Sequence, residues 1–175
     1  VDLRYGWDLR VQGHRDKLDM VREVLQPLVK FSAPECRLWS CASNSRTDRD
    51  SMTLDRETEE EMLTWLWKEN EIQYRSARGY VNENGLSSQI WTQSPLRANQ
   101  DIVGNRRQRC DGCAHGLQSP GGVPILKQYR LDTNLPLAHT ALRCPGHLEH
   151  CPIEGGVGLY TNVYSEGFCQ ELVKD

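Results

Sequence analysis

The sequence lacks a long apolar segment and any excess of basic residues. No stretch approaches the roughly 18 consecutive apolar residues that a membrane-spanning helix needs. The chain has 21 Lys and Arg against 24 Asp and Glu, so its formal net charge is −3. Proteins that bind along a nucleic-acid backbone are usually strongly basic, because they neutralise phosphates. We therefore expect neither a membrane protein nor a direct nucleic-acid binder.

Local motifs of catalysis are also missing. The sequence contains no G-x-S-x-G motif, and the glycine-rich stretch 155–158 is not followed by the Lys-Ser/Thr pair of a phosphate-binding loop. We predict that the chain is not an enzyme, and we assign it no catalytic residue, no metal ligand and no cofactor. An active site assembled only by the fold stays open as an alternative.

Cysteine is unusually frequent in this sequence. A chain of 175 residues can bury roughly 70% of the surface that its unfolded form exposes, so folding requires neither disulfides nor a metal. Free cysteines in a reducing compartment are mostly small buried residues. We therefore expect a cytoplasmic protein, with a secreted protein that keeps one unpaired thiol as the alternative. The seven cysteines are Cys36, Cys41, Cys110, Cys113, Cys144, Cys151 and Cys169.

Hydrophobic periodicity predicts both helices and strands. Apolar residues at every odd position of 1–11 predict a strand, and helical spacing from about Asp16 to Leu28 predicts a helix that Pro27 kinks or ends. A second amphipathic helix is expected from Arg56 to about Asn70, capped by Asp55. Further strands are predicted at 37–42, 86–93, 123–132 and 157–164, with a turn at 82–85 and a short C-terminal helix around 168–172.

These elements predict an α+β fold: one domain over residues 1–175, with a mainly antiparallel sheet and two principal amphipathic helices.

The strongest metal-binding pattern is the C-x2-C pair formed by Cys110 and Cys113, because this spacing can direct two thiolates at one tetrahedral ion. A zinc site needs two more ligands. The sequence offers Cys144, His147, His150 or Cys151, or His115 beside the pair. The six residues between Cys144 and Cys151 do not match the usual spacing, so zinc binding by these cysteines is left open.

A strongly acidic stretch begins the second predicted helix. Seven acids stand against two bases between residues 48 and 61. One interpretation is a solvated helix start that the helix dipole stabilises. The other is a surface that attracts a basic partner, with Trp65 as an aromatic anchor because it lies off the apolar stripe. We predict this partner-binding set: Asp48, Asp50, Asp55, Glu57, Glu59, Glu60, Glu61 and Trp65.

Several short pieces stand in a characteristic order along the sequence: Tyr5-Gly6-Trp7 with Arg10, the helix through Leu25 and Leu28, Trp39 after Pro34, the 54–66 helix, Asn84-Gly85-Leu86 leading to Ile90-Trp91, and Cys110 to Gly112. Together they resemble the immunity protein 52 family of bacterial polymorphic toxin systems. The resemblance extends to about Leu131, beyond which the sequence has no clear counterpart. Thr92-Gln93-Ser94 also departs from the Asn-Gly-like turn that the family keeps there.

This resemblance implies an immunity protein in the cytoplasm that binds and neutralises a cognate toxin, typically a nuclease with a restriction-endonuclease fold. Such a nuclease has a basic groove, which the acidic stretch would occupy or border. The alternative is a zinc-stabilised or disulfide-bonded interaction module, with Cys110, Cys113, Cys144 and Cys151 as its framework.

Overall fold

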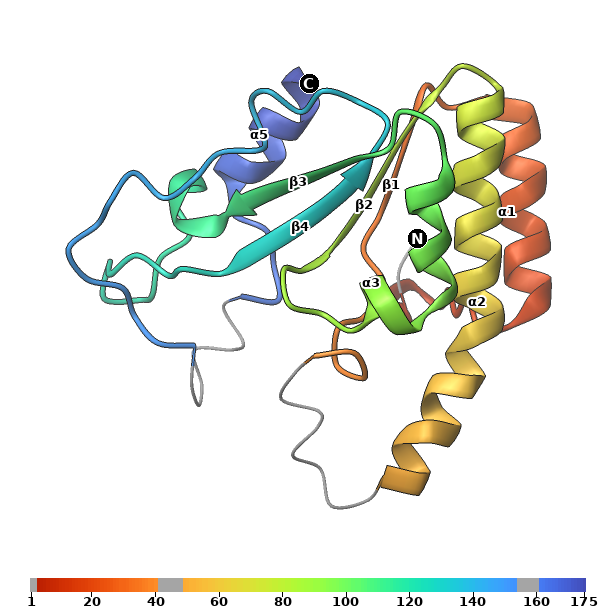
Figure 1. Ribbon diagram of the computed structural model, residues 1–175, viewed down its shortest axis with the longest axis horizontal. Coiled ribbons are helices and arrows are strands. Elements are labelled where there is room, and N and C mark those ends of the chain that lie inside the picture. The colour runs from red at the N-terminus through yellow and green to blue at the C-terminus, as the bar shows by residue number, and fades with distance from the viewer. Residues whose placement is uncertain (1–2, 41–48, 154–160) are drawn as a thin grey trace.

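Four strands form one mixed sheet in the order β1-β2-β4-β3 (Figure 1). The computed structural model describes residues 3–40, 49–153 and 161–175. β1 runs parallel to β2, and the other two pairings are antiparallel. The predicted α+β class is confirmed, with a sheet that combines both kinds of pairing. The strands are β1 Val29–Ser32, β2 Gly79–Gly85, β3 Arg106–Asp111 and β4 Gln128–Thr133.

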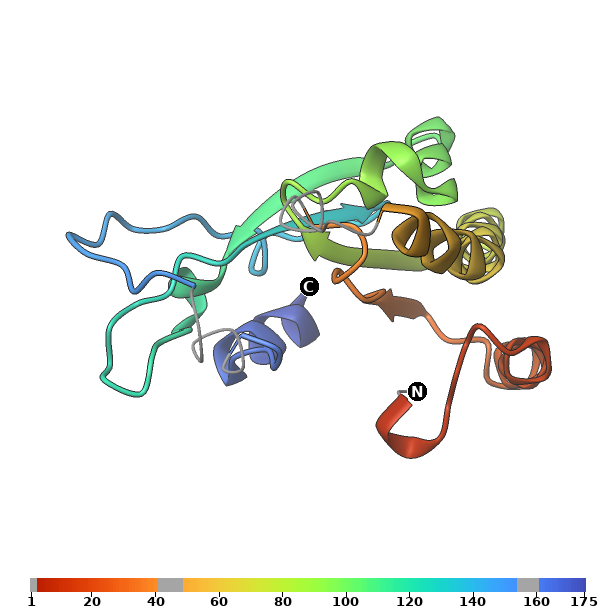
Figure 2. The ribbon, with the colours of Figure 1, turned by 90° about the horizontal axis from the view of Figure 1, so that it is seen from below.

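The helices lie on both faces and at one side of this sheet. α1 and α2 lie side by side. α3 and η3 lie on one face of the sheet, and α5 lies on the other (Figure 2). Successive side chains of β4 point to these two faces in turn. The guanidinium of Arg130 lies 4.5 Å from the ring centroid of Trp91 on α3, whereas the ring centroid of Tyr129 lies 5.8 Å from that of Phe168 on α5. The elements are α1 Gln12–Leu25, α2 Arg49–Arg75, α3 Ile90–Gln93, α5 Glu166–Lys174, and the 3-10 helices η1 Leu3–Tyr5, η3 Pro95–Asp101 and η4 Gly112–His115.

Two buried clusters fill the space on either side of the sheet. The first, between α2 and α3, contains Leu38, Trp39, Leu63, Leu66, Ile90, Trp91 and Leu96. The second, between the sheet and α5, contains Val81, Cys110, Tyr129, Leu131, Leu137 and Phe168. The fold thus has a substantial apolar interior.

Three predicted helices are confirmed. α1 begins earlier than expected and ends at Leu25, where Gln26 adopts a left-handed conformation (φ 45°) directly before Pro27. α2 extends the second predicted helix at both ends, and an ion pair between Glu71 and Arg75 at 2.6 Å supports its last turn. α5 corresponds to the short C-terminal helix.

The predicted N-terminal strand is wrong. Residues 3–11 form η1 and turns, and Gly6 has a positive φ of 80°, which interrupts an extended backbone. The segment folds back so that the ring of Trp7 meets that of His14 on α1, edge to face at 5.8 Å. Tyr5 and Val11 are exposed, so the alternating apolar residues do not share a buried face.

The prediction of a turn at 82–85 followed by a strand is also wrong. Residues 82–85 belong to β2, and the chain then turns into α3. Asn82 accepts a hydrogen bond from Ser32 at 2.5 Å, and Asn84 donates one to the Pro34 carbonyl at 2.8 Å. Each amide thus makes one of these hydrogen bonds, which offsets part of the cost of burying polar side chains in a central strand.

The other predicted strands have mixed outcomes. β4 confirms the C-terminal part of the strand expected at 123–132, whereas β1 and β3 had not been predicted. Residues 37–40 form turns, and the rest of the strand expected at 37–42 lies outside the described residues. The glycine-rich stretch 155–158 lies outside the described residues. Of the strand expected at 157–164, only residues 161–164 are described, and they are not a strand. Over the described ranges, no helix has the length and apolar character required to cross a membrane.

Candidate metal centre

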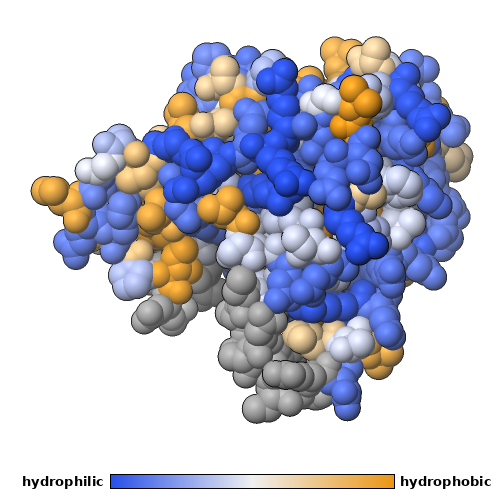
Figure 3. Space-filling model, viewed as in Figure 1, coloured by the Kyte–Doolittle hydropathy of each residue, from blue (hydrophilic) through white to orange (hydrophobic). Residues whose placement is uncertain are grey.

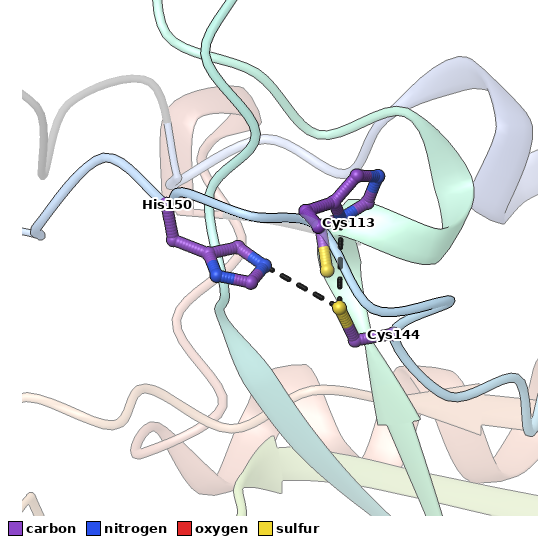
Figure 4. A group of neighbouring side chains, drawn as sticks. Cys113, Cys144 and His150 are labelled. Carbon is purple, nitrogen blue, oxygen red and sulfur yellow. Dashed lines mark hydrogen bonds between the residues drawn. The ribbon is translucent and has the colours of Figure 1, made fainter.

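Four side chains of the kinds that bind transition metals converge beside η4 (Figure 4). They are Cys113, Cys144, His147 and His150, and their sulfur and ring nitrogen atoms all lie within 4.8 Å of one another. Cys144 Sγ is 3.5 Å from His147 Nδ1 and 3.4 Å from His150 Nε2. The two imidazole rings meet edge to face, with their centroids 5.4 Å apart. We call these four residues the Cys2His2 cluster.

Two distances within the Cys2His2 cluster match those expected around a tetrahedral zinc ion. Zinc binds thiolate sulfur at about 2.3 Å and imidazole nitrogen at about 2.0–2.1 Å, which places a sulfur and a nitrogen ligand about 3.6 Å apart. Both measured distances from Cys144 Sγ agree with this value to within about 0.2 Å. Two thiolates with two imidazoles form a donor set typical of structural zinc sites.

Cys113 reaches the cluster because β3 ends in a tight 3-10 turn. Gly112 begins η4, where its N–H donates to the Lys127 carbonyl at 2.7 Å and its carbonyl accepts from Leu117 at 3.1 Å. A Cβ at Gly112 would lie 2.8 Å from Leu117 Cδ2, so only glycine fits without displacing that side chain. This packing holds the buried Cys113 thiol at the end of the sheet.

The other three ligands come from one extended segment at the edge of the molecule. Every third residue turns inward: Cys144, His147 and His150 are half-buried, whereas the residues between them are exposed. Gly146 has φ 96°, which lets the segment bend so that its N–H donates to Cys144 Sγ at 3.4 Å. We call residues 142–151 the ligand loop.

Both ends of the ligand loop are fixed to the fold by backbone hydrogen bonds that do not use the sulfur and ring nitrogen atoms of the cluster. Asp111 Oδ2 accepts from the Cys144 N–H at 3.0 Å, and the Asp111 N–H donates to the Leu142 carbonyl at 2.9 Å. At the other end, the Cys151 N–H donates to the Pro124 carbonyl at 2.8 Å.

Asp111 is itself held in an ionised state. Its carboxylate accepts two hydrogen bonds from Arg109, at 2.7 and 3.0 Å. Burial works against ionisation, but the bonds from Arg109 and from the Cys144 N–H outweigh it, so the pKa of Asp111 lies below its usual value. A charged acceptor strengthens the bond that anchors the loop.

The two thiols of the cluster have different environments. The N–H groups of Gly146 and His147 lower the pKa of Cys144 to about 7, whereas burial raises the pKa of Cys113 to about 11. Cys144 is therefore ready to bind a cation at neutral pH. A bound cation would favour deprotonation of the Cys113 thiol, because the thiolate is the form that binds a metal.

The framework of four cysteines considered from the sequence is corrected by the structure. Cys110 lies within β3, fully buried in the second core cluster, and burial raises the pKa of its thiol to about 12. Cys151 lies outside the cluster, and its sulfur contacts the Pro152 carbonyl at 3.7 Å. The structure brings together only Cys113 and Cys144 of that framework, with two histidines that the sequence also offered.

The acidic stretch is only partly available at the surface of α2. Asp50, Glu57, Glu60 and Glu61 are exposed, and Asp55 is half-buried, while Asp48 lies outside the described residues. Glu61 pairs with the buried Arg15 of α1 at 3.1 Å but keeps most of its side chain in solvent. Asp50, Glu57 and Glu61 are spaced to share one face of the helix. These exposed acids retain the character of a negative surface.

Two residues of the predicted binding set have structural roles instead. Glu59 is 5% exposed and accepts a hydrogen bond from Trp39 Nε1 at 2.9 Å, and its burial raises the pKa of the carboxyl. Trp65 is half-buried, packs against the first core cluster, and donates to Asp19 Oδ1 of α1 at 2.8 Å. Both side chains join elements of the fold, so they offer little surface to a partner.

The Cys2His2 cluster contains four protein ligands, which would fill the coordination sphere of zinc. A catalytic zinc keeps an open position for water or substrate, whereas a structural zinc is closed by four protein ligands. The cluster therefore suits an ion that fixes the ligand loop.

No family model matches the chain, and no similar protein was found among curated proteins or solved structures.

Proposed function

We propose that this protein is a zinc-stabilised interaction module. The observation that carries the proposal is the convergence of the four ligand atoms of Cys113, Cys144, His147 and His150 within 4.8 Å. The ion would join η4, at the end of the sheet, to a loop that is distant in sequence. The zinc ion would stabilise the conformation of the ligand loop, since a site closed by four protein ligands has no position for a substrate.

The exposed surface of the ligand loop supports a role in binding another protein. Leu148 lies between two ligands and is fully exposed, and Leu142 and Ile153 near the ends of the loop are also exposed. Figure 3 shows apolar surface at the left margin of the molecule, over the extended segment seen in Figure 1. A rigid loop loses less conformational entropy on binding, so zinc would favour recognition of a partner by this surface.

The test is the zinc content of the full chain, purified without chelator and measured by elemental analysis. We expect one zinc ion per chain, lost in Cys144→Ser. Cys169→Ser provides a matched control, because Cys169 is exposed on α5 outside the cluster. Protein without zinc, or equal zinc content in both variants, would contradict the proposal.

We propose toxin neutralisation as a second function, supported by the exposed acids Asp50, Glu57 and Glu60 at the start of α2. Exposed negative charge at the start of a helix accelerates association with a basic partner such as the groove of a nuclease. The experiment is co-expression with the protein encoded by the neighbouring gene, scored for growth arrest by that protein alone, for rescue of growth and for a complex. Glu57→Gln combined with Glu60→Gln should slow association and flatten its salt dependence, whereas Glu149→Gln, in the ligand loop, should not. Neither rescue nor a complex would contradict this function.

A further inference from the structure

We propose that the Cys2His2 cluster is a peroxide-sensitive switch, in which oxidation joins Cys113 to Cys144 and expels the zinc ion. This inference rests on the proposed function, because it requires the ion. The two sulfur ligands come from separate segments and meet at the cluster within 4.8 Å (Figure 4). A disulfide between them would consume half of the ligands at once.

The two thiols also differ in their access to an oxidant. Cys144 is half-buried on the ligand loop, where its immediate neighbours Arg143 and Pro145 are exposed, while Cys113 is buried behind it. A hydroperoxide therefore reaches Cys144 first, and Cys113 stands next to it as the resolving thiol. Cys144 Sγ needs to move only a few ångströms, because a disulfide places its sulfurs about 2.05 Å apart.

The chemistry balances with hydrogen peroxide as the oxidant. The Cys144 thiolate attacks one peroxide oxygen, so an S–O bond forms, the O–O bond breaks, and the departing hydroxide takes a proton to become water. The Cys113 thiolate then attacks the Cys144 sulfur; the S–S bond forms, and the second hydroxide leaves with another proton as water. The two sulfurs together lose two electrons, which reduce the two peroxide oxygens.

Loss of the ion would release only part of the ligand loop. The bonds from Cys144 N–H to Asp111 and from Cys151 N–H to the Pro124 carbonyl do not use the metal. The rings of His147 and His150 contact each other and Cys144. The segment 145–150, including the exposed Leu148, would therefore become free while the sheet stays folded.

The experiment uses the full chain with the thiols outside the cluster region replaced: Cys36→Ser, Cys41→Ser and Cys169→Ser. Cys110 is kept because it is buried in the core. The zinc-loaded protein is treated with hydrogen peroxide, and released zinc is measured with a chromogenic chelator. We expect loss of one equivalent of zinc, loss of two hydrogen atoms from the protein mass, and a Cys113–Cys144 disulfide in the peptide map. A phosphine reductant followed by zinc should restore the starting state.

Cys151→Ser added to this background is the matched control, since Cys151 is the nearest other thiol along the loop. It should respond to peroxide in the same way. Zinc retained during oxidation, or released with a Cys144–Cys151 disulfide, would overturn the switch while leaving the zinc-stabilised module intact. Absence of zinc before treatment would overturn both.

Discussion

The carboxylate of Asp111 accepts a hydrogen bond from the backbone N–H of Cys144 at 3.0 Å, and so connects the last residue of β3 to the ligand loop. The same carboxylate is held by Arg109. Since Cys113 follows two residues after Asp111, one short segment both supplies a ligand and positions another. This contact explains how two distant parts of the chain present their sulfurs to one point.

Removal of this contact should weaken metal binding without abolishing the fold. Asp111→Ala leaves the Cys144 N–H without its acceptor, so we expect zinc affinity to fall about 10–100-fold, as when a partner of a metal ligand is lost. Competition with a chelator of known affinity measures the change. Asp132→Ala is the control, because Asp132 is equally buried and makes the same paired bonds with Arg130 on β4. Equal losses of affinity in both variants would assign the effect to stability alone.

Removal of zinc should loosen the ligand loop locally. The two buried core clusters contain Cys110 but none of the four ligands, so chelation should leave them packed. We expect hydrogen exchange of residues 145–150 to accelerate at least tenfold, with little change in β2 and β4. Exchange accelerating throughout the sheet would mean that the ion supports the whole fold.

A half-buried lysine makes stability depend on pH. Lys30 of β1 donates to the Leu66 carbonyl of α2 at 3.2 Å, beside Glu69 and Arg22, which pair at 2.9 Å. Burial lowers the pKa of Lys30 from 10.5 to about 7, so the unfolded chain binds more protons between these values and the contribution of Lys30 to stability rises with pH there. Its destabilising effect is largest below pH 7.

Lys30→Met removes this charge with little change in side-chain volume. The variant should be more stable than the wild type at pH 6.5, and its advantage should shrink by at most about 1.4 kcal/mol per pH unit between pH 7 and 9. Denaturant unfolding at several pH values measures this difference. A difference that stays constant over this range would show that Lys30 keeps its ordinary pKa.

The acids of α2 should separate into structural and surface residues. Glu59→Ala leaves Trp39 Nε1 without its acceptor, and we expect it to lower the free energy of unfolding by about 1–3 kcal/mol. Glu57→Ala, two residues earlier and exposed, should change it by less than about 0.5 kcal/mol. Urea denaturation measures both. Equal effects would place Glu59 at the surface with its neighbours.

The sequence predicted helices better than strands. The apolar stripe of α2 follows helical spacing and places Leu63 and Leu66 in the first core cluster, so packing against the interior and local preference agree there. The stripe of α1 also follows helical spacing, but Val21 and Leu25 on it are exposed. β2 has buried asparagines at Asn82 and Asn84, whose hydrogen bonds to Ser32 and to the Pro34 carbonyl depend on distant segments. Local sequence favoured a turn there, and only the folded sheet supplies those partners.

The sequence predicted part of the metal site. The C-x2-C spacing indicated Cys110 as a metal ligand. However, a strand directs alternate side chains to opposite faces, and Cys110 points into the core beside its strand partner Tyr129. The regular signal was the spacing of two residues between successive ligands at Cys144, His147 and His150. Its fourth partner is set by the meeting of η4 with the ligand loop, which no local pattern encodes.

X-ray absorption spectroscopy of the zinc-loaded protein reports the ligand atoms directly. Coordination by Cys113, Cys144, His147 and His150 predicts two sulfurs at about 2.3 Å and two nitrogens at about 2.0–2.1 Å. A spectrum with three or four sulfurs, or with only oxygen and nitrogen ligands, would contradict the Cys2His2 centre.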